Sequence, residues 1–202
     1  MKKRLVIALL ISLLSLFLVS GCFTGLTISP QEQIPSETIP PIVVQMCQED
    51  DCEGLLAGAI RNSSVVDCAF FDLDTPSTVD ALSSVQARVV VDAENTNDVL
   101  AGLNVRYDTR EAYMHNKFCV FDDGVWIGSV NPSGREFSAN DNNALLIRSR
   151  FLQENYKSEF EELWNGQFGR GEVVVHSSVM LNGELFENRF CPEDACATTV
   201  RS

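Results

Sequence analysis

The chain has 202 residues, enough for one domain or for one domain with a tail. Apolar residues make up 45% of it, which argues against an intrinsically disordered protein. Its 28 acidic and 15 basic residues give a formal charge of −13. This balance argues against binding of nucleic acid through a general basic surface, so any chemistry on phosphate must depend on a local cluster of residues.

Residues 1–22 have the pattern of a signal peptide. Three basic residues at positions 2–4 precede an apolar run, Leu5–Val19, which is shorter than the roughly 20 residues that span a bilayer. The run ends at Ser20-Gly21-Cys22, which resembles a prokaryotic lipobox, in which the Cys is lipidated and becomes the new N-terminus. We therefore expect lipidation at Cys22 and an extracytoplasmic, membrane-anchored lipoprotein at the cell surface. Ordinary secretion and an uncleaved anchor are the alternatives.

Six further cysteines lie in the part expected outside the cytoplasm, where disulfides form and persist. Two pairs, Cys47 with Cys52 and Cys191 with Cys196, share the spacing C-x4-C, within reach of a local disulfide. Zinc sites usually use C-x2-C with nearby His, so we expect no metal. Cys68 and Cys119 lie in apolar, strand-like runs and are expected to be buried free thiols.

Three segments follow the signal peptide. Residues 23–41 contain four prolines and are expected to form a tether. Residues 42–171 alternate strand-like and helix-like patterns, which predicts an α/β layered domain. The expected strands are 42–46, 65–73, 87–92, 105–107, 117–121, 125–130 and 144–147; the expected helices follow Asp50 or Asp51, Thr75, Asn97 and Arg150, the last spanning 151–164. Asp123-Gly124 is a hairpin signal.

The segment 172–202 is expected to contain a second hairpin, in which Asn182-Gly183 joins 173–181 to 184–190. It also holds an internal repeat. The form apolar-C-x-E-D-x-C occurs at 46–52 and again at 190–196, each time after a strand-like run. The second copy therefore predicts the start of a truncated second repeat.

The densest chemistry lies between His115 and Asn131, which read H-N-K-F-C-V-F-D and, after a short hairpin, G-S-V-N. This stretch resembles the HKD motif of the phospholipase D superfamily, H-x-K-x4-D followed by G-S-x-N. The matching positions are His115, Lys117, Asp122, Gly128, Ser129 and Asn131. The resemblance extends over about residues 42–171. It implies a phospholipase D-like layered sandwich: a mixed β-sheet flanked by helices, with a single HKD repeat and a C-terminal β-hairpin stub.

The residue types suit attack on a phosphodiester. A neutral imidazole is not repelled by an anionic phosphate, and its reference pKa is about 6.5. Residues i and i+2 of a strand face the same side, so His115 and Lys117 project together, and Lys117 can stabilise charge on the phosphate. Ser129 and Asn131 have the same spacing and are expected to donate hydrogen bonds to that phosphate. The resemblance implies a phosphohistidine at His115, no metal or other cofactor, and a supporting role for Asp122.

The motif departs from the family pattern in two places. Five residues, 123–127, separate Asp122 from Gly128, where six are usual. Relatives also often carry S-E-N, whose Glu orients the nucleophilic His, whereas this chain has Asn142 at the Glu position. Asn142 is the candidate for orienting His115, and Asp141 is the alternative.

The chain has one HKD element, but the chemistry uses two histidines, of which one attacks and the other protonates the leaving oxygen. His176 lacks a Lys two residues on and is expected to be a surface histidine. Single-motif relatives form homodimers, which implies a two-fold dimer with His115 facing its twin. A missing second repeat is the alternative.

The sequence thus predicts a phospholipase D-type phosphodiesterase, a hydrolase acting on phospholipid head groups. Resemblance to the Nuc-like and cardiolipin-hydrolase-like single-motif branch keeps a metal-independent DNA/RNA endonuclease as the alternative, although the acidic charge argues against it. An inactive truncated surface protein is a second alternative, favoured by Asn142 and the unfinished repeat.

Overall fold

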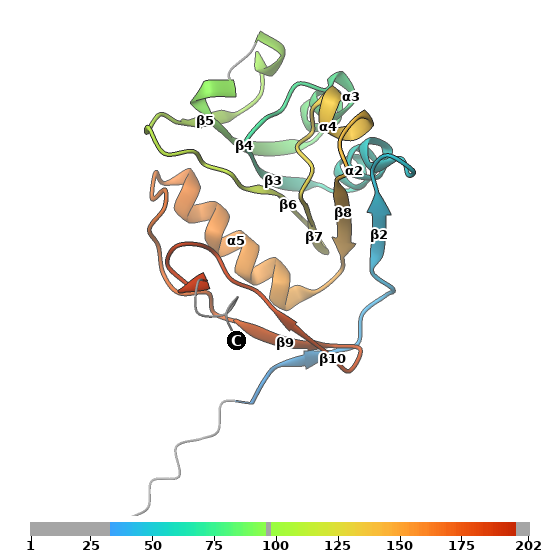
Figure 1. Ribbon diagram of the computed structural model, residues 1–202, viewed down its shortest axis with the longest axis vertical. Helices are drawn as coiled ribbons and strands as arrows, with labels where there is room; N and C mark the ends of the chain where they lie inside the picture. The colour runs from blue at the N-terminus through green and yellow to red at the C-terminus, as the bar shows by residue number, and fades with distance from the viewer. Residues whose placement is uncertain (1–32, 96–97, 197–202) are drawn as a thin grey trace, which may run out of the picture. The chain divides into compact units, whose positions relative to one another are not determined.

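The computed structural model describes residues 33–95 and 98–196. The folded unit begins at Ile34 and is built on a seven-stranded mixed sheet with strand order β2-β8-β7-β6-β3-β4-β5 (Figure 1). Its strands are β2 (Val43–Met46), β3 (Val65–Phe70), β4 (Gln86–Asp92), β5 (Val105–Asp108), β6 (Lys117–Phe121), β7 (Gly124–Gly128) and β8 (Asn143–Ile147). β3, β4 and β5 are parallel, and the other neighbours are antiparallel. The α/β prediction is confirmed.

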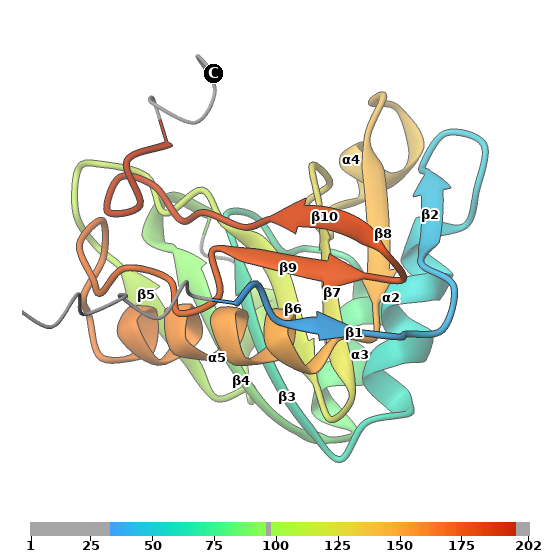
Figure 2. The same cartoon turned by 90° about the horizontal axis from the view of Figure 1, so that it is seen from below.

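Each face of the sheet has its own apolar core. One core contains residues of α2 and α3, and the other contains residues of α5 and of a three-stranded sheet with order β1-β9-β10 (Figures 1 and 2). The helices are α2 (Cys52–Arg61), α3 (Pro76–Ser83), α4 (Gly134–Ser138) and α5 (Arg150–Trp164), with short 3-10 turns η1 (Ala93–Asn95) and η2 (Asp98–Leu100). The smaller sheet consists of β1 (Ser36–Glu37), β9 (Ser178–Leu181) and β10 (Glu184–Glu187).

Helix starts follow the capping chemistry of the sequence. The Asp51 carboxylate accepts a hydrogen bond from the Gly54 amide at 2.8 Å and caps α2. The Ser149 hydroxyl accepts one from the Leu152 amide at 3.2 Å and caps α5. Capping therefore fixes where the two longest helices meet the sheet.

The β6–β7 hairpin turns one residue earlier than expected. Phe121 pairs with Gly124, so the turn residues are Asp122 and Asp123 rather than Asp123 and Gly124. A Cβ atom at Gly124 would lie 2.3 Å from the Ile147 carbonyl oxygen on β8. Gly124 is therefore required for the close approach of two strands and not for the turn itself.

The C-terminal hairpin has the expected turn, but the expected tether ends earlier. Asn182 and Gly183 have φ angles of 53° and 91°, as a two-residue turn between β9 and β10 requires. β1 lies within the segment 23–41 and pairs in parallel with β9. The prediction that the folded part starts at Ile42 is thus wrong. β1 has only two residues, which are too few to show a hydrophobic period in the sequence.

Disulfides join Cys47 to Cys52 and Cys191 to Cys196, as the spacing predicts. The expectation of free thiols at Cys68 and Cys119 is wrong, because these residues also form a disulfide. They are directly opposite each other on β3 and β6, with Cα atoms 4.1 Å apart. Only strand pairing brings together residues that are 51 positions apart in the chain.

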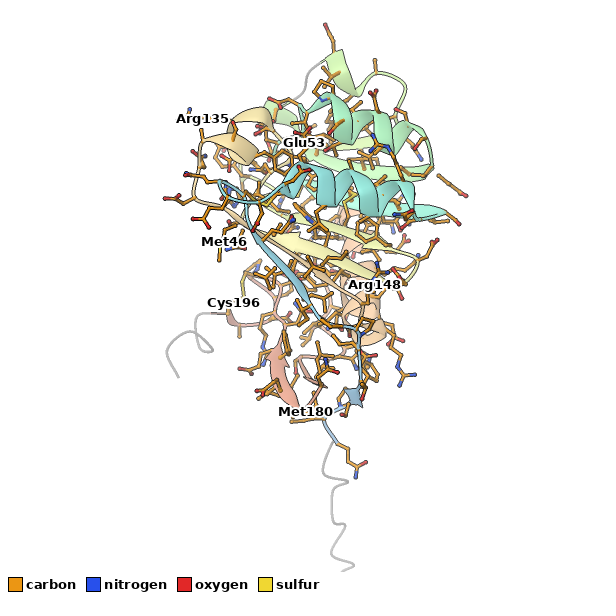
Figure 3. All side chains as sticks on the ribbon, turned by 90° about the vertical axis from the view of Figure 1, so that its right-hand side faces the viewer. Met46, Glu53, Arg135, Arg148, Met180 and Cys196 are labelled. Atoms are coloured by element: carbon orange, nitrogen blue, oxygen red, sulfur yellow. A yellow bond between two sulfur atoms is a disulfide. The ribbon has the colours of Figure 1, made fainter. Side chains whose placement is uncertain are left out.

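The two copies of the repeated motif form the same disulfide-closed turn. In the first, an Asp50 carboxylate oxygen accepts from the Met46 amide at 2.9 Å. In the second, an Asp194 carboxylate oxygen accepts from the Phe190 amide at 2.6 Å. In both turns the aspartate amide also donates back to the apolar residue's carbonyl oxygen. Figure 3 labels Met46 in the first turn and Cys196 in the second. The sequence repeat is therefore also a structural one.

The expected signal peptide and Cys22 lie outside the described residues. Among the helices that the structure describes, none has both the length and the apolar character needed to cross a membrane.

Candidate active site

The two halves of the expected motif meet where β6 begins and β7 ends. Lys117 is the first residue of β6, and His115 lies two positions before it, just outside the strand. Phe118 pairs with Ile127, which places Lys117 beside Gly128 and the following Ser129. His115, Lys117 and Ser129 line one hollow of about 590 Å³.

A phenylalanine from the end of β3 supports both functional groups. The His115 and Phe71 ring centroids are 5.0 Å apart, and the Lys117 ammonium lies 5.5 Å from the centre of the same ring. Lys117 Nζ also donates a hydrogen bond to the His115 carbonyl oxygen at 3.1 Å. These contacts hold the imidazole and the ammonium on one side of the sheet end.

The surroundings keep the imidazole neutral. Partial shielding from water lowers the pKa of His115, and the positive charge of Lys117 lowers it further. Burial also lowers the pKa of Lys117 to about 8, so the ammonium is mostly protonated at neutral pH. A neutral nitrogen nucleophile beside a cation is suited to an anionic phosphate.

The rest of the hollow has an apolar wall beside polar residues, among them Asn116 and Asn143. β6, β7, β8 and α5 supply Phe118, Ile127, Leu145 and Tyr156, and the segment after β10 adds Arg189 and Phe190. Phe190 packs edge-on against Tyr156, with ring centroids 4.9 Å apart. The disulfide-closed turn at 190–196 thus contributes an aromatic wall to the site.

Residues 71–164 match the family described as "Cardiolipin synthase, PLD-like domain". This stretch includes every position of the expected HKD motif together with Phe71. Residues 71–164 therefore form a phospholipase D-like domain.

Curated relatives carry the same kind of domain. The "Mitochondrial cardiolipin hydrolase" of Xenopus laevis is 32% identical over 127 residues, which cover 54% of this chain and 57% of that protein. The human protein of that name is 28% identical over 124 residues, covering 54% and 49%. The chain thus aligns with only about half the length of these relatives.

Solved structures share the fold. The phospholipase D family member Nuc from Salmonella typhimurium superposes with a TM-score of 0.58 at 22% identity, covering 62% of this chain and 94% of that one. NucT from Helicobacter pylori gives a TM-score of 0.53 at 18% identity, with the same coverage. The phospholipase D-like sandwich expected from the sequence is therefore confirmed.

Asp122 lies at the far end of β6 from His115. It lies five positions after Lys117, which is about 16 Å of extended backbone. Its carboxylate accepts hydrogen bonds from the Ser64 and Val65 amides at 2.6 and 3.2 Å, and these bonds lower its pKa. Asp122 thus anchors the start of β3 and is not part of the hollow.

Asn131 is buried, and its side-chain oxygen accepts from the Asp72 amide at 3.2 Å. Asn131 is not among the residues that line the hollow. The hydrogen bond joins the segment after β7 to the segment after β3. In this structure, Asn131 therefore links these two segments and does not face the hollow.

The interpretation of Asn142 as the group that orients His115 is wrong in this structure. Its side-chain oxygen accepts from the Ser129 hydroxyl at 2.9 Å, and its amide nitrogen donates to a Glu136 carboxylate oxygen at 2.6 Å. A carboxylate accepts but cannot donate, so Glu136 requires the amide nitrogen and turns the oxygen toward Ser129. The Ser129 hydroxyl, expected to donate to phosphate, donates to Asn142 instead.

Three parts of the site escaped the sequence analysis: Phe71, Glu136 and the pair Arg189–Phe190. Phe71 follows a buried strand and had the pattern of a core residue. Glu136 lies on a helix of only five residues, too short to show periodicity. Arg189 and Phe190 are more than 70 positions from His115, and only the fold brings them to it.

A cluster of carboxylates lies beside the site. Oxygens of Glu159, Glu162 and Glu193 lie within 4.8 Å of one another, and Glu159 and Glu193 line a second hollow that also reaches His115. Burial raises the pKa of Glu159 to about 7, with a further contribution from the neighbouring carboxylates. At and below neutral pH, a proton on Glu159 therefore reduces the electrostatic repulsion among the three carboxylates.

Proposed function

We propose that this chain is a phospholipase D-type phosphodiesterase that cleaves the head groups of phospholipids through a phosphohistidine at His115. The observation that carries the proposal is the grouping of a neutral imidazole, an ammonium and Ser129 in one hollow. The phospholipase D-like domain that residues 71–164 match supports this reaction class.

In the first step, the lone pair of a His115 ring nitrogen forms a bond to phosphorus, and the bond from phosphorus to the leaving oxygen breaks. A second, protonated imidazole gives its proton to that oxygen, which departs as an alcohol. Water then attacks phosphorus, the nitrogen–phosphorus bond breaks, and the second imidazole takes the proton from water. The products are a phosphate monoester and an alcohol, and Lys117 stabilises charge on the phosphate in both steps.

The second imidazole comes from another copy of the chain. The sequence contains two histidines, and His176 lies elsewhere, with Nε2 2.8 Å from a Glu154 carboxylate oxygen and its ring against Phe151. His115 is exposed, so a two-fold dimer can bring two copies of it together.

A phospholipid fits the hollow better than a nucleic acid does. Its apolar wall of aromatic and aliphatic side chains suits a lipid, and the formal charge of −13 disfavours a polyanion. The relatives named as cardiolipin hydrolases favour the same class of substrate. Lipidation at Cys22 would hold the enzyme at a membrane surface outside the cytoplasm, and the three disulfides agree with an oxidising compartment.

The test is turnover by the mature chain in EDTA, with phospholipid vesicles in one arm and plasmid DNA in the other. We expect release of head-group alcohol and phosphatidic acid from the vesicles. His115→Ala should abolish turnover, whereas His176→Ala, the matched control, should keep it. Mass spectrometry after quenching without acid should find a phosphoryl group on His115.

Each outcome separates the alternatives. Nicked plasmid with unchanged lipid would overturn the lipid assignment and establish the nuclease. Turnover that survives His115→Ala would overturn the nucleophile. Lack of turnover on both substrates would identify an inactive member of the superfamily, and a strict monomer in light scattering would remove the shared site.

A further inference from the structure

Both carboxylate oxygens of Glu136 are held by hydrogen bonds near the proposed site. Glu136 lies on α4, the short helix that Arg135 marks in Figure 3. One carboxylate oxygen accepts from the Asn142 side chain at 2.6 Å, and the other accepts from the Asn140 side chain at 2.7 Å. Asn142 also donates to the Glu136 carbonyl oxygen at 3.2 Å. Donors to both oxygens fix the direction of the carboxylate.

This carboxylate controls a chain of hydrogen bonds that ends in the hollow. Asn142, held through its nitrogen, accepts from the Ser129 hydroxyl at 2.9 Å, and Ser129 Oγ accepts from the Asn143 amide at 3.1 Å. Ser129 lines the hollow with His115 and Lys117. The orientation of the Ser129 hydroxyl is therefore set from Glu136 through one amide.

Glu136 also affects the protonation of His115 and of Lys117. For His115, shielding from water and Lys117 lower the pKa, whereas Glu136 and Asp92 raise it. For Lys117, burial lowers the pKa, whereas Glu136 and Asp72 raise it. Glu136 thus raises the pKa of both groups.

We propose that Glu136 is a positioning residue of this site, which orients Asn142 and Ser129 and holds a negative charge beside His115 and Lys117. The inference rests on the proposed function. Transfer of phosphorus to a neutral imidazole makes the ring cationic, and an anion nearby stabilises that state. Glu136 thereby supplies the negative charge that the neutral amide of Asn142 cannot supply.

The first test measures protonation without turnover. The chain has two histidines, so His176→Gln leaves a single imidazole signal for titration by NMR. In that background, Glu136→Gln should lower the pKa of His115, because the substitution removes the anion and keeps the shape. Glu184→Gln is the matched control: it makes the same substitution at an exposed residue of β10 that does not line the hollow and whose carboxylate makes no hydrogen bond within the described residues, and it should leave the pKa of His115 unchanged.

The second test exchanges the carboxylate and the amide between positions 136 and 142. The double variant Glu136→Gln with Asn142→Glu moves the carboxylate to the other end of the same hydrogen bond and preserves the net charge. Glu136→Gln should move the pH profile of turnover toward lower pH, and the exchange should move it back toward that of the wild type. If Glu136 has only a structural role, Glu136→Gln should lower the stability of the protein, and neither variant should shift the pH profile in this way.

The proposal is overturned if Glu136→Gln leaves the His115 titration unmoved, or if Glu184→Gln moves it equally. A protein that shows the expected titration but cleaves no phosphodiester refutes the proposed function alone, because the NMR measurement does not require turnover.

Discussion

The ammonium of Lys117 changes charge close to physiological pH, because burial lowers its pKa to about 8. Below this pH the site presents a cation to a bound phosphate, and above it the cation is lost. The Phe71 ring and the His115 carbonyl oxygen keep the side chain in place in either state. The decrease of activity at alkaline pH should therefore follow the deprotonation of Lys117.

We expect kcat/KM of the wild type to fall as pH rises through about 8, since this parameter reports ionisations of the free enzyme. A bound phosphate anion favours the ammonium, so the fall in kcat should come at higher pH. Lys117→Arg should move the fall in kcat/KM well above pH 8, because guanidinium stays protonated. Lys117→Met should lower kcat by about 10²–10³ at pH 7.

Lys157→Arg is the matched control, because Lys157 is exposed and its nearest carboxylate is Asp67 on the middle of β3. It should leave the profile unchanged. If Lys117→Arg has the same alkaline limb as the wild type, the ionisation belongs to another group.

At the scale of the elements, the three disulfides differ in the length of chain that they close. Cys68–Cys119 closes 51 positions between two central strands, whereas Cys47–Cys52 and Cys191–Cys196 each close five. In the chain-entropy account, stabilisation grows with loop length, to about 4 kcal/mol for the long loop and about 2 kcal/mol for each short one.

We therefore expect the double variant Cys68→Ala with Cys119→Ala to lower the melting temperature by roughly 10 °C in calorimetry. Cys47→Ala with Cys52→Ala is the matched control and should lower it about half as far. Equal decreases in melting temperature for the two cysteine pairs would show that loop length does not determine how much a disulfide stabilises the protein.

Two glycines in different surroundings give opposite expectations for stability. Gly124→Ala places a Cβ atom 2.3 Å from the Ile147 carbonyl oxygen, so β7 and β8 must separate at a cost of about 1–3 kcal/mol. Gly58 lies within α2 with open space around it, and Gly58→Ala should stabilise the protein by about 0.5–1 kcal/mol. Urea denaturation measures both, and a neutral Gly124→Ala would contradict the close strand contact.

The same elements show what sequence patterns can and cannot predict. β3, β4 and α5 have enough length for their buried residues to set a period, so the patterns locate them well. β1 has two residues and α4 has five, and neither length can show a period. The Cys68–Cys119 bond and the contact of Gly124 with β8 depend on strand neighbours, which no local pattern contains.

For the site, the spacing of the motif identifies His115, Lys117 and Ser129 as neighbours, because two short antiparallel strands have little freedom in how they pair. It groups Asp122 with them, although the same strand carries Asp122 to the opposite end of the sheet. Glu136, Phe71 and Phe190 enter through tertiary packing alone. A motif thus predicts the nucleophile better than it predicts the groups that support it.

At the scale of the whole molecule, the proposed chemistry requires two imidazoles where one chain places one. Because His115 is exposed and His176 is paired with Glu154, we propose a second copy of the chain as the source of the other imidazole. A site shared across a two-fold axis loses function when either copy is altered. In a mixture of wild-type and variant chains, activity should therefore depend on the composition of each dimer and not only on the amount of wild-type chain.

Mixing subunits tests this dependence. Wild type and His115→Ala are unfolded together, refolded with disulfide exchange and assayed on vesicles. In an equal mixture, random pairing makes about a quarter of the dimers fully wild type, so total activity should fall to about half of that from the same amount of wild type refolded alone. The matched mixture of wild type with His176→Ala should show no such loss of activity, because the variant keeps His115. Activity that stays proportional to the amount of wild-type chain would show that each subunit works alone and would require a second proton donor within the same chain.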